Sequence, residues 1–157
     1  MTTQLNIHKI NSMKLKVYYD INLNKTITDV IKQLSKKEDE MLAPFSLTHS
    51  HAKYIENVYR FKTVTMADLT ELAGTDKANT TRVVKDLLNQ DIVTKSGGER
   101  KFNLNLTEKG KKIAEHFKTQ KEAFMKQVFK DFSKDEIETL KMLLEKLFIG
   151  TTSALKG

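Results

Sequence analysis

The sequence contains no cysteine, and it has only one proline and six glycines among 157 residues. The absence of cysteine excludes a disulfide scaffold, a cysteine zinc site, an iron–sulfur cluster, a thiol nucleophile and a thiol redox sensor. The scarcity of proline and glycine argues against collagen-like, linker-rich and many-turned all-β chains. These absences favour a mainly helical protein the size of one domain, or of one protomer whose core is completed by a partner.

The sequence also lacks any run of about 20 apolar residues, the length that a membrane-spanning helix needs. Its N-terminal segment has no apolar block of the kind that signal peptides contain. We therefore expect a cytoplasmic protein that has no contact with a membrane. The net charge is +7 and is spread along the chain, which favours a polyanionic partner only weakly.

Residues 12–43 have apolar side chains mostly at helical spacing, and we expect one long helix there. Strict alternation of apolar residues in the first part of this segment leaves a strand open as an alternative for residues 14–24. Pro44 is expected to end the helix, because the residue before a proline is pushed out of the α region.

Residues 108–150 are expected to form two further helices. Thr107 is placed to cap the first of them, and Ser133 with Glu136 forms a capping box that opens the second. The second helix is expected to end before Gly150. The expected flexible tails are residues 1–11 and 151–157.

Between these segments, residues 45–107 are expected to form a separate lobe that begins with three helices. Thr48 is placed to cap the first helix, and Thr65 with Asp68 resembles a capping box for the second, which stops at Gly74. Two short helices joined by a tight glycine-containing turn, as the second and third are, form the helix-turn-helix pattern. The expected helices are residues 49–61, 66–73 and 77–90.

After the third helix the apolar period changes from that of a helix to that of a β-hairpin. Residues 91–95 are a short apolar-centred run, residues 96–100 are a turn, and residues 101–107 alternate apolar and polar side chains. A helix-turn-helix followed immediately by a hairpin is the winged helix. The predicted fold is therefore mainly α (α+β), a winged helix-turn-helix flanked by long N- and C-terminal helices.

A winged helix is suited to duplex DNA, because its second helix fits the major groove and its hairpin can lay basic residues along a neighbouring groove. If the apolar stripe of residues 77–90 faces inward, a row of basic and amide side chains is left outside. Asp76 is expected at the start of this helix, and Asp86 away from the DNA. The inward set is Thr80, Val83, Val84, Leu87 and Leu88. The predicted DNA-binding residues are Thr65, Lys77, Asn79, Thr81, Arg82 and Lys85 in the helix-turn-helix, and Lys95, Arg100 and Lys101 in the wing.

Three stretches of the sequence, taken together, match the pattern of a known family. Residues 42–48 (LAPFSLT) precede and open a helix, residues 65–95 contain the helix-turn-helix and the first wing strand, and residues 99–113 contain the second wing strand with the LTEKG that starts the next helix. In this combination, from about Leu42 to Ile113, the chain resembles the MarR (multiple-antibiotic-resistance regulator) family of bacterial transcription factors.

The wing departs from the pattern of that family. Asp91 stands where the family usually has a glycine between the recognition helix and the wing. Members commonly carry an Asp-x-Arg element in the wing, and here Arg100 matches the arginine whereas Gly98 replaces the acid. The loop is also a few residues shorter. The usual brace of the wing is therefore incomplete, and Glu99 or Asp91 is left to substitute for the missing acid.

The resemblance implies a repressor-type regulator that binds pseudo-palindromic DNA as a homodimer. The dimer would be built by residues 12–43 and 108–150, whose apolar stripes exceed what one small lobe can bury. In the family a small-molecule effector often releases the DNA, but the residues that bind it vary too much to be assigned here. The absence of cysteine excludes the branch that senses peroxide through a thiol.

Three other functions have less support. A winged helix also serves as a protein-interaction module that does not bind DNA, but the predicted outer face is cationic rather than apolar. Some members of the family respond to zinc; here His49 and His51 are two residues apart, point in different directions, and are expected to be ordinary surface or interface residues rather than metal ligands. No nucleophile elbow, phosphate loop or paired-carboxylate motif indicates an enzyme, and no cofactor is expected.

Overall fold

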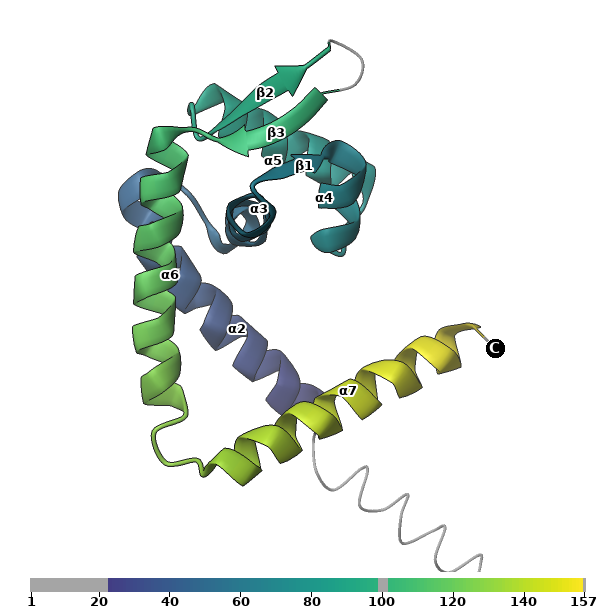
Figure 1. Cartoon of the computed structure of the whole chain (residues 1–157). Coiled ribbons are helices and arrows are strands. Elements are labelled where there is room, and N and C mark those ends of the chain that lie inside the picture. Colours follow the sequence, from purple (N-terminus) through teal and green to yellow (C-terminus); the bar gives the residue numbers. More distant parts are fainter. Residues whose placement is uncertain (1–22, 99–101, 157) are drawn as a thin grey trace, which may run out of the picture. The chain divides into compact units, whose positions relative to one another are not determined.

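The computed structural model describes residues 23–98 and 102–156 (Figure 1). The chain divides into two compact units between Ala114 and Glu115. The fold is mainly α with one small antiparallel sheet, as predicted. In chain order the elements are α2 (Leu23–Leu42), the 3-10 helix η1 (Ala43–Phe45), α3 (His49–Phe61), β1 (Thr63–Thr65), α4 (Met66–Leu72), α5 (Lys77–Asn89), β2 (Val93–Gly97), β3 (Phe102–Leu106), α6 (Glu108–Val128) and α7 (Lys134–Lys156).

Helix α2 ends next to the proline, as predicted. Its last residue is Leu42, and Pro44 lies in the first turn of η1. The fixed φ of proline and its missing N–H stop an α-helix at this point. Of residues 14–24, for which a strand was the alternative, the structure describes Leu23 and Asn24, and both are helical. The other residues of that alternative lie outside the described part of the chain.

The capping residues predicted from the sequence are present at the helix starts. At α4, Thr65 Oγ1 accepts from the backbone N–H of Asp68 (3.1 Å), and the Asp68 carboxylate accepts from that of Thr65 (3.0 Å). At α6, Thr107 Oγ1 accepts from the backbone N–H of Gly110 (3.0 Å). At α7, Ser133 and Glu136 form the reciprocal pair (3.2 and 2.8 Å). These bonds satisfy N–H groups that have no partner within the helix.

The sheet contains one strand that the sequence did not predict. Strand β3 lies in the middle, with β2 on one side and β1 on the other, and Val64 of β1 faces Leu104 of β3 in the register. Lys62, with a φ of 68°, turns the chain from α3 into β1. Three residues are too few to show a period of two, so the pattern gives no signal for β1.

The core of the first unit lies where α3, α4 and α5 meet one another and the sheet. Helix α3 contacts α5, α4 and β3, and α5 contacts β2. Burial of these large apolar side chains is the main stabilising contribution to the lobe. The fully buried residues include Leu42, Tyr54, Ile55, Val58, Leu69, Val83, Leu87, Ile92 and Leu104.

Helix α7 is longer than predicted: residues 151–156, which were assigned to a tail, are helical, and Gly157 lies outside the described residues. The helix continues through Gly150 to Lys156. One glycine inside a helix costs only about 1 kcal/mol, which a long helix tolerates. The hydroxyls of Thr151 and Thr152 donate to the carbonyls of Leu147 (3.0 Å) and Phe148 (2.8 Å), so both threonines are accommodated within the helix.

The second unit exposes an apolar face along α7. Among the described residues, no helix has the length and hydrophobicity required to cross a membrane. The large apolar side chains of α7 that are exposed in the single chain are Leu140, Met142, Leu143, Leu144, Leu147, Phe148, Ile149 and Leu155.

Candidate nucleic-acid interface

The turn between α4 and α5 is set by a glycine and an aspartate. Gly74 has a φ of 59°, in the left-handed region that glycine enters without steric cost. Asp76 precedes α5, and its carboxylate accepts from the backbone N–H of Asn79 (2.8 Å), which confirms the predicted place of Asp76 at the helix start. The turn therefore fixes where α5 begins.

Helix α5 buries the face that its apolar spacing predicted. Thr80, Val83, Val84 and Leu87 are buried, and Leu88 is partly buried. Because these residues face α3 and the sheet, the remaining side of α5 is open to solvent. The predicted residues Lys77, Thr81, Arg82 and Lys85 are exposed on this side, whereas Asn79 is half-buried.

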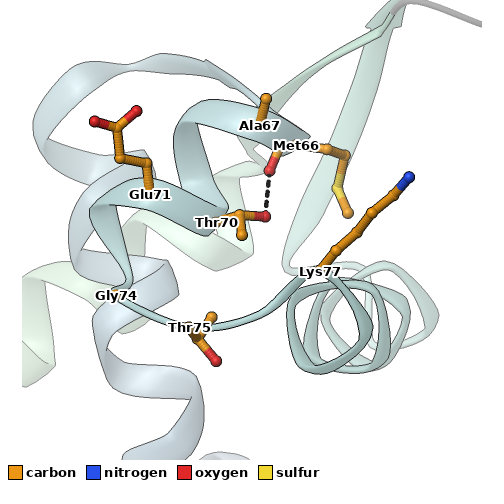
Figure 2. Close-up of a pocket in the computed structure, with 7 residues that line it drawn as sticks. All are labelled: Met66, Ala67, Thr70, Glu71, Gly74, Thr75 and Lys77. Atoms are coloured by element: carbon orange, nitrogen blue, oxygen red, sulfur yellow. Dashed lines mark hydrogen bonds between the residues drawn. The ribbon is translucent and has the colours of Figure 1, made fainter. Parts of the chain in front are cut away.

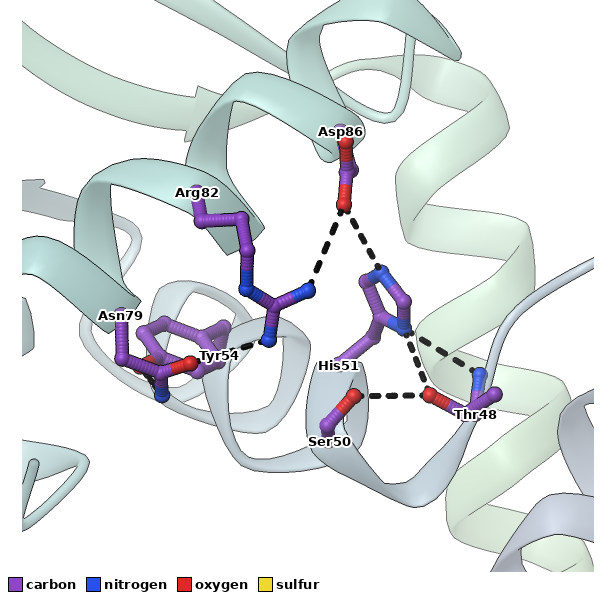
Figure 3. Close-up of polar contacts among 7 residues, drawn as sticks. All are labelled: Thr48, Ser50, His51, Tyr54, Asn79, Arg82 and Asp86. Carbon is purple, nitrogen blue, oxygen red and sulfur yellow. Dashed lines mark hydrogen bonds and ion pairs between the residues drawn. The ribbon is translucent and has the colours of Figure 1, made fainter.

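The guanidinium of Arg82 lies between two polar side chains of its own helix (Figure 3). Its Nη2 donates to Asn79 Oδ1 (2.9 Å), and its Nη1 is 3.9 Å from Asp86 Oδ2. Asp86 in turn lies 4.0 Å from Nε2 of His51 on α3. Asp86 is thus turned toward α3.

His51 differs from the prediction, which placed it at the surface or at an interface. Its side chain is buried, and Nδ1 accepts a hydrogen bond from the backbone N–H of Thr48 (3.2 Å), the residue that caps α3. A ring nitrogen that accepts this bond carries no proton, so the proton of the neutral ring is on Nε2, toward Asp86. Burial lowers the pKa of His51, and the charge of Asp86 opposes this shift.

His49 points away from His51, as predicted. Its backbone N–H donates to Asp39 Oδ1 (2.7 Å), and its Nδ1 lies 2.9 Å from the same oxygen. The hydrogen bond from the His49 backbone holds the pKa of Asp39 below its usual value. Within residues 23–98 and 102–156, no group of three or more histidine, aspartate and glutamate side chains could hold a metal ion.

Of the three residues predicted to bind DNA from the wing, the structure describes Lys95. Lys95 is exposed on β2, and its ammonium lies 4.3 Å from the ring centroid of Phe102 on β3, a cation–π contact across the hairpin. Arg100 and Lys101 lie outside the described residues. Thr65, the remaining predicted residue, uses its hydroxyl at the start of α4, where it donates to Asp68 Oδ2 (2.7 Å).

Asp91, in the link from α5 to the wing, has the backbone conformation that the family's usual glycine would favour. Asp91 has a φ of 55°, the left-handed conformation that a glycine would adopt more easily. Thr107 Oγ1 donates to the carbonyl of Asp91 (2.7 Å), so the start of α6 is tied to this corner. Gly110 lies against the same link, since a Cβ there would be 2.0 Å from the carbonyl oxygen of Ile92.

A surface hollow borders the start of α5 (Figure 2). Lys77 and Met66 lie at one side of it, and Gly74 lies in the turn below. The hydroxyl of Thr70 is used within α4, where it donates to the carbonyl of Met66 (2.7 Å). The hollow therefore adjoins the exposed face of α5. Its lining residues are Met66, Ala67, Thr70, Glu71, Gly74, Thr75 and Lys77.

Two of the comparisons with known proteins point to the same family. The model of the MarR family matches residues 45–101. No curated protein matches the sequence. Several solved structures do match the fold, although their sequences are 19–22% identical to this one.

Three of these structures each cover more than 80% of this chain. A MarR protein from Peptoclostridium difficile has a TM-score of 0.77 at 19% identity and covers 86% of this chain and 90% of its own. A MarR transcriptional regulator from Methanosarcina mazei has a TM-score of 0.72 at 20% identity, with coverages of 84% and 90%. A mutant MarR from E. coli complexed with operator DNA has a TM-score of 0.72 at 22% identity, with coverages of 82% and 95%. Residues 45–101 therefore match the model of the MarR family, and the fold of the chain is similar to that of solved MarR proteins.

Proposed function

We propose that the chain is a MarR-type transcriptional regulator, a repressor that binds pseudo-palindromic duplex DNA as a homodimer. The observation that carries the proposal is the exposed face of α5, which bears Lys77, Arg82 and Lys85 opposite the buried face of the helix. A helix held in this way, with cations on its open side, can enter a major groove without exposing the core. The solved complex of the E. coli relative with operator DNA supports the same use of the fold.

Each exposed residue of the lobe is given a role by its place. Arg82, midway along α5, is proposed to reach a guanine edge or a phosphate, and Lys85, one turn nearer the C-terminus of α5, to lie closer to the DNA backbone. Lys77 and Thr81, in the first half of α5, are proposed as further DNA contacts. Lys95 on the wing is proposed to contact phosphate. The hydroxyl of Thr65 already caps α4, so a DNA contact there would be shared with Asp68. Arg100 and Lys101 stay predictions for the wing.

The exposed apolar face of α7 supports the homodimer. A row of leucine, isoleucine and phenylalanine side chains open to water is unfavourable in a monomer, and a second copy could cover it. Residues 12–43 and 108–150 are accordingly proposed to build the dimerisation region. Two copies of α5 would then enter successive major grooves about one helical turn apart.

A small-molecule effector is proposed as the means of release. The effector would bind the dimer more tightly when the two α5 helices are in the arrangement that does not fit DNA. Its binding would therefore shift the dimer population toward that arrangement. We propose no enzymatic activity, no cofactor and no metal dependence for this protein.

A gel shift with the DNA that flanks the protein's own gene tests the proposal. The expected result is a sequence-specific complex at low salt that survives competitor DNA. The competing function, a winged-helix interaction module, predicts no specific complex with this or any other duplex. Loss of the specific complex in the presence of excess random DNA would therefore favour the module.

A further inference from the structure

The side-chain amide of Asn79 is engaged at both ends, which sets this residue apart from the others on the open side of α5. Its Oδ1 accepts from Arg82 Nη2 at 2.9 Å. Its Nδ2 donates to Thr75 Oγ1 at 3.0 Å and to the hydroxyl of Tyr54 at 3.3 Å. The side chain is half-buried between α5, α3 and the turn before α5.

The orientation of this amide follows from the chemistry of its neighbours. A guanidinium only donates hydrogen bonds, so the Asn79 oxygen must face Arg82. The Nδ2 group then points toward Thr75 and Tyr54, whose hydroxyl oxygens can accept. Flipping the amide would place two donors together at Arg82 and lose that hydrogen bond, although the two hydroxyls behind it could then donate to the oxygen.

The anchor behind Asn79 is part of the packed lobe. Tyr54 is fully buried, and its hydroxyl also lies 3.5 Å from Thr80 Oγ1 inside the lobe. Thr75 belongs to the turn that Gly74 and Asp76 fix. The amide of Asn79 therefore connects the core of the lobe to the guanidinium of Arg82. To pair with a base edge, Asn79 would have to give up the contacts that hold it.

We infer that Asn79 is a positioning residue, which acts on DNA through Arg82 rather than by reading a base itself. The inference rests on the proposed function, because it takes Arg82 as the residue that contacts DNA. Asn79 holds one Nη of the guanidinium, and Asp86 lies 3.9 Å from the other. The long side chain of Arg82 is thus ordered before DNA arrives, so less side-chain entropy is lost on binding.

A double-mutant cycle separates positioning from direct readout. Replacing Asn79→Ala should weaken binding to the specific duplex on the order of 3- to 10-fold per half-site, the cost of ordering one long side chain. In an Arg82→Ala background the same replacement should change the affinity less than about 2-fold, because the residue it positions is absent. Additive losses, with a wild type that prefers the specific duplex, would overturn this inference and leave the proposed function standing.

Two further variants control for folding and for proximity. Tyr54→Phe removes the anchoring hydroxyl from a fully buried residue that cannot itself touch DNA. It should reproduce part of the Asn79→Ala loss and become neutral when Arg82 is alanine. Asn89→Ala removes an exposed asparagine at the end of the same helix and should leave affinity unchanged. Thermal melting of each variant identifies any loss that comes from unfolding.

A measurement without DNA completes the test. In the free wild type, nitrogen-15 NMR of the Arg82 guanidinium should show slowed rotation about the Nε–Cζ bond, and Asn79→Ala should restore fast rotation. Fast rotation in the wild type would overturn the inference whatever the DNA result. If the guanidinium is held but the wild type binds specific and scrambled duplexes equally, the proposed function fails and with it the assignment of Asn79 to DNA binding.

Discussion

His51 connects the start of α3 with the exposed face of α5. Its Nδ1 accepts from the backbone of Thr48, and its Nε2 points toward Asp86 at 4.0 Å. No hydrogen-bond partner for this buried Nε2 is found in the described part of the chain. A proton added to the ring would place a donor at Nδ1 opposite the donor of Thr48, so α3 would lose this cap.

Acid should destabilise the fold through His51. Burial lowers its pKa in the folded state, so between about pH 6.5 and that lowered value the unfolded chain binds a proton that the folded chain does not. The contribution of neutral His51 to the free energy of unfolding is complete above about pH 6.5, and it is lost as the pH falls toward the lowered pKa. The slope is at most about 1.4 kcal/mol per pH unit.

His51→Gln tests this expectation, since a glutamine oxygen can still accept from Thr48 but does not titrate. Urea unfolding at pH 7.5 and 5.5 should show a smaller loss of stability in the variant than in the wild type. His116→Gln, at an exposed histidine of α6, controls for the removal of a histidine. An unchanged acid dependence in His51→Gln would show that His51 does not carry it.

The sequence predicted which side of α5 most of its residues occupy; Asn79, predicted on the outer side, is half-buried. The inward position of Val83 and Leu87, and the outward position of Arg82, follow from helical spacing alone. The partners of His51 and Asn79 could not be predicted, because they depend on how α3 crosses α5. A histidine or asparagine has the same polar appearance in a sequence whether its side chain meets water or a neighbouring helix.

Among the elements, α6 makes an unusually close approach to the segment that leads into the wing. A Cβ at Gly110 would be 2.0 Å from Ile92 O and 3.1 Å from Leu106 Cδ2. The backbone carbonyl cannot move aside without disturbing its bond from Thr107 N (3.0 Å). This contact gives a physical reason for a glycine at the end of the LTEKG segment.

Alanine should have opposite effects at two helical glycines. Gly110→Ala should destabilise the fold by about 1–3 kcal/mol or more, because the methyl group overlaps a fixed carbonyl. Gly150→Ala, where the new Cβ meets nothing within 4 Å among the described residues beyond its own helix backbone and chain neighbours, should stabilise it by about 1 kcal/mol through helix propensity. Both free energies can be measured by denaturant titration. Equal effects of the two substitutions would contradict the close approach at Gly110.

Element types were predictable where several residues carry one period or a cap marks the boundary, as at Thr65 and Ser133. Strand β1 was missed because three residues show no period. The end of α7 was placed too early because Gly150 resembles a stop signal. Whether a glycine ends a helix depends on the conformation of the next residues, and here the residues after Gly150 stay helical to Lys156.

For the whole molecule, the exposed apolar side chains of α7 predict self-association. Sedimentation at micromolar concentration should give a species of twice the 18.0 kDa chain mass. Replacing Leu144 and Phe148 with glutamate should shift it to the monomer, because the charges would be buried without partners in an interface. Lys141→Glu together with Glu145→Lys, on the same helix, serves as a control that keeps the apolar face. A wild-type monomer of about 18 kDa would contradict the proposed homodimer.

The claim that α5 recognises DNA is tested most directly by comparing Arg82→Ala with Lys130→Ala. Both variants lose one positive charge, but Lys130 lies between α6 and α7, outside the winged helix. Each protein is titrated with the specific duplex and with a scrambled one over a series of salt concentrations, which separates base recognition from phosphate attraction. We expect Arg82→Ala to lose at least about 1–3 kcal/mol per half-site on the specific duplex, and Lys130→Ala to bind it as the wild type does. Wild-type affinity of Arg82→Ala for the specific duplex would contradict the proposed recognition face.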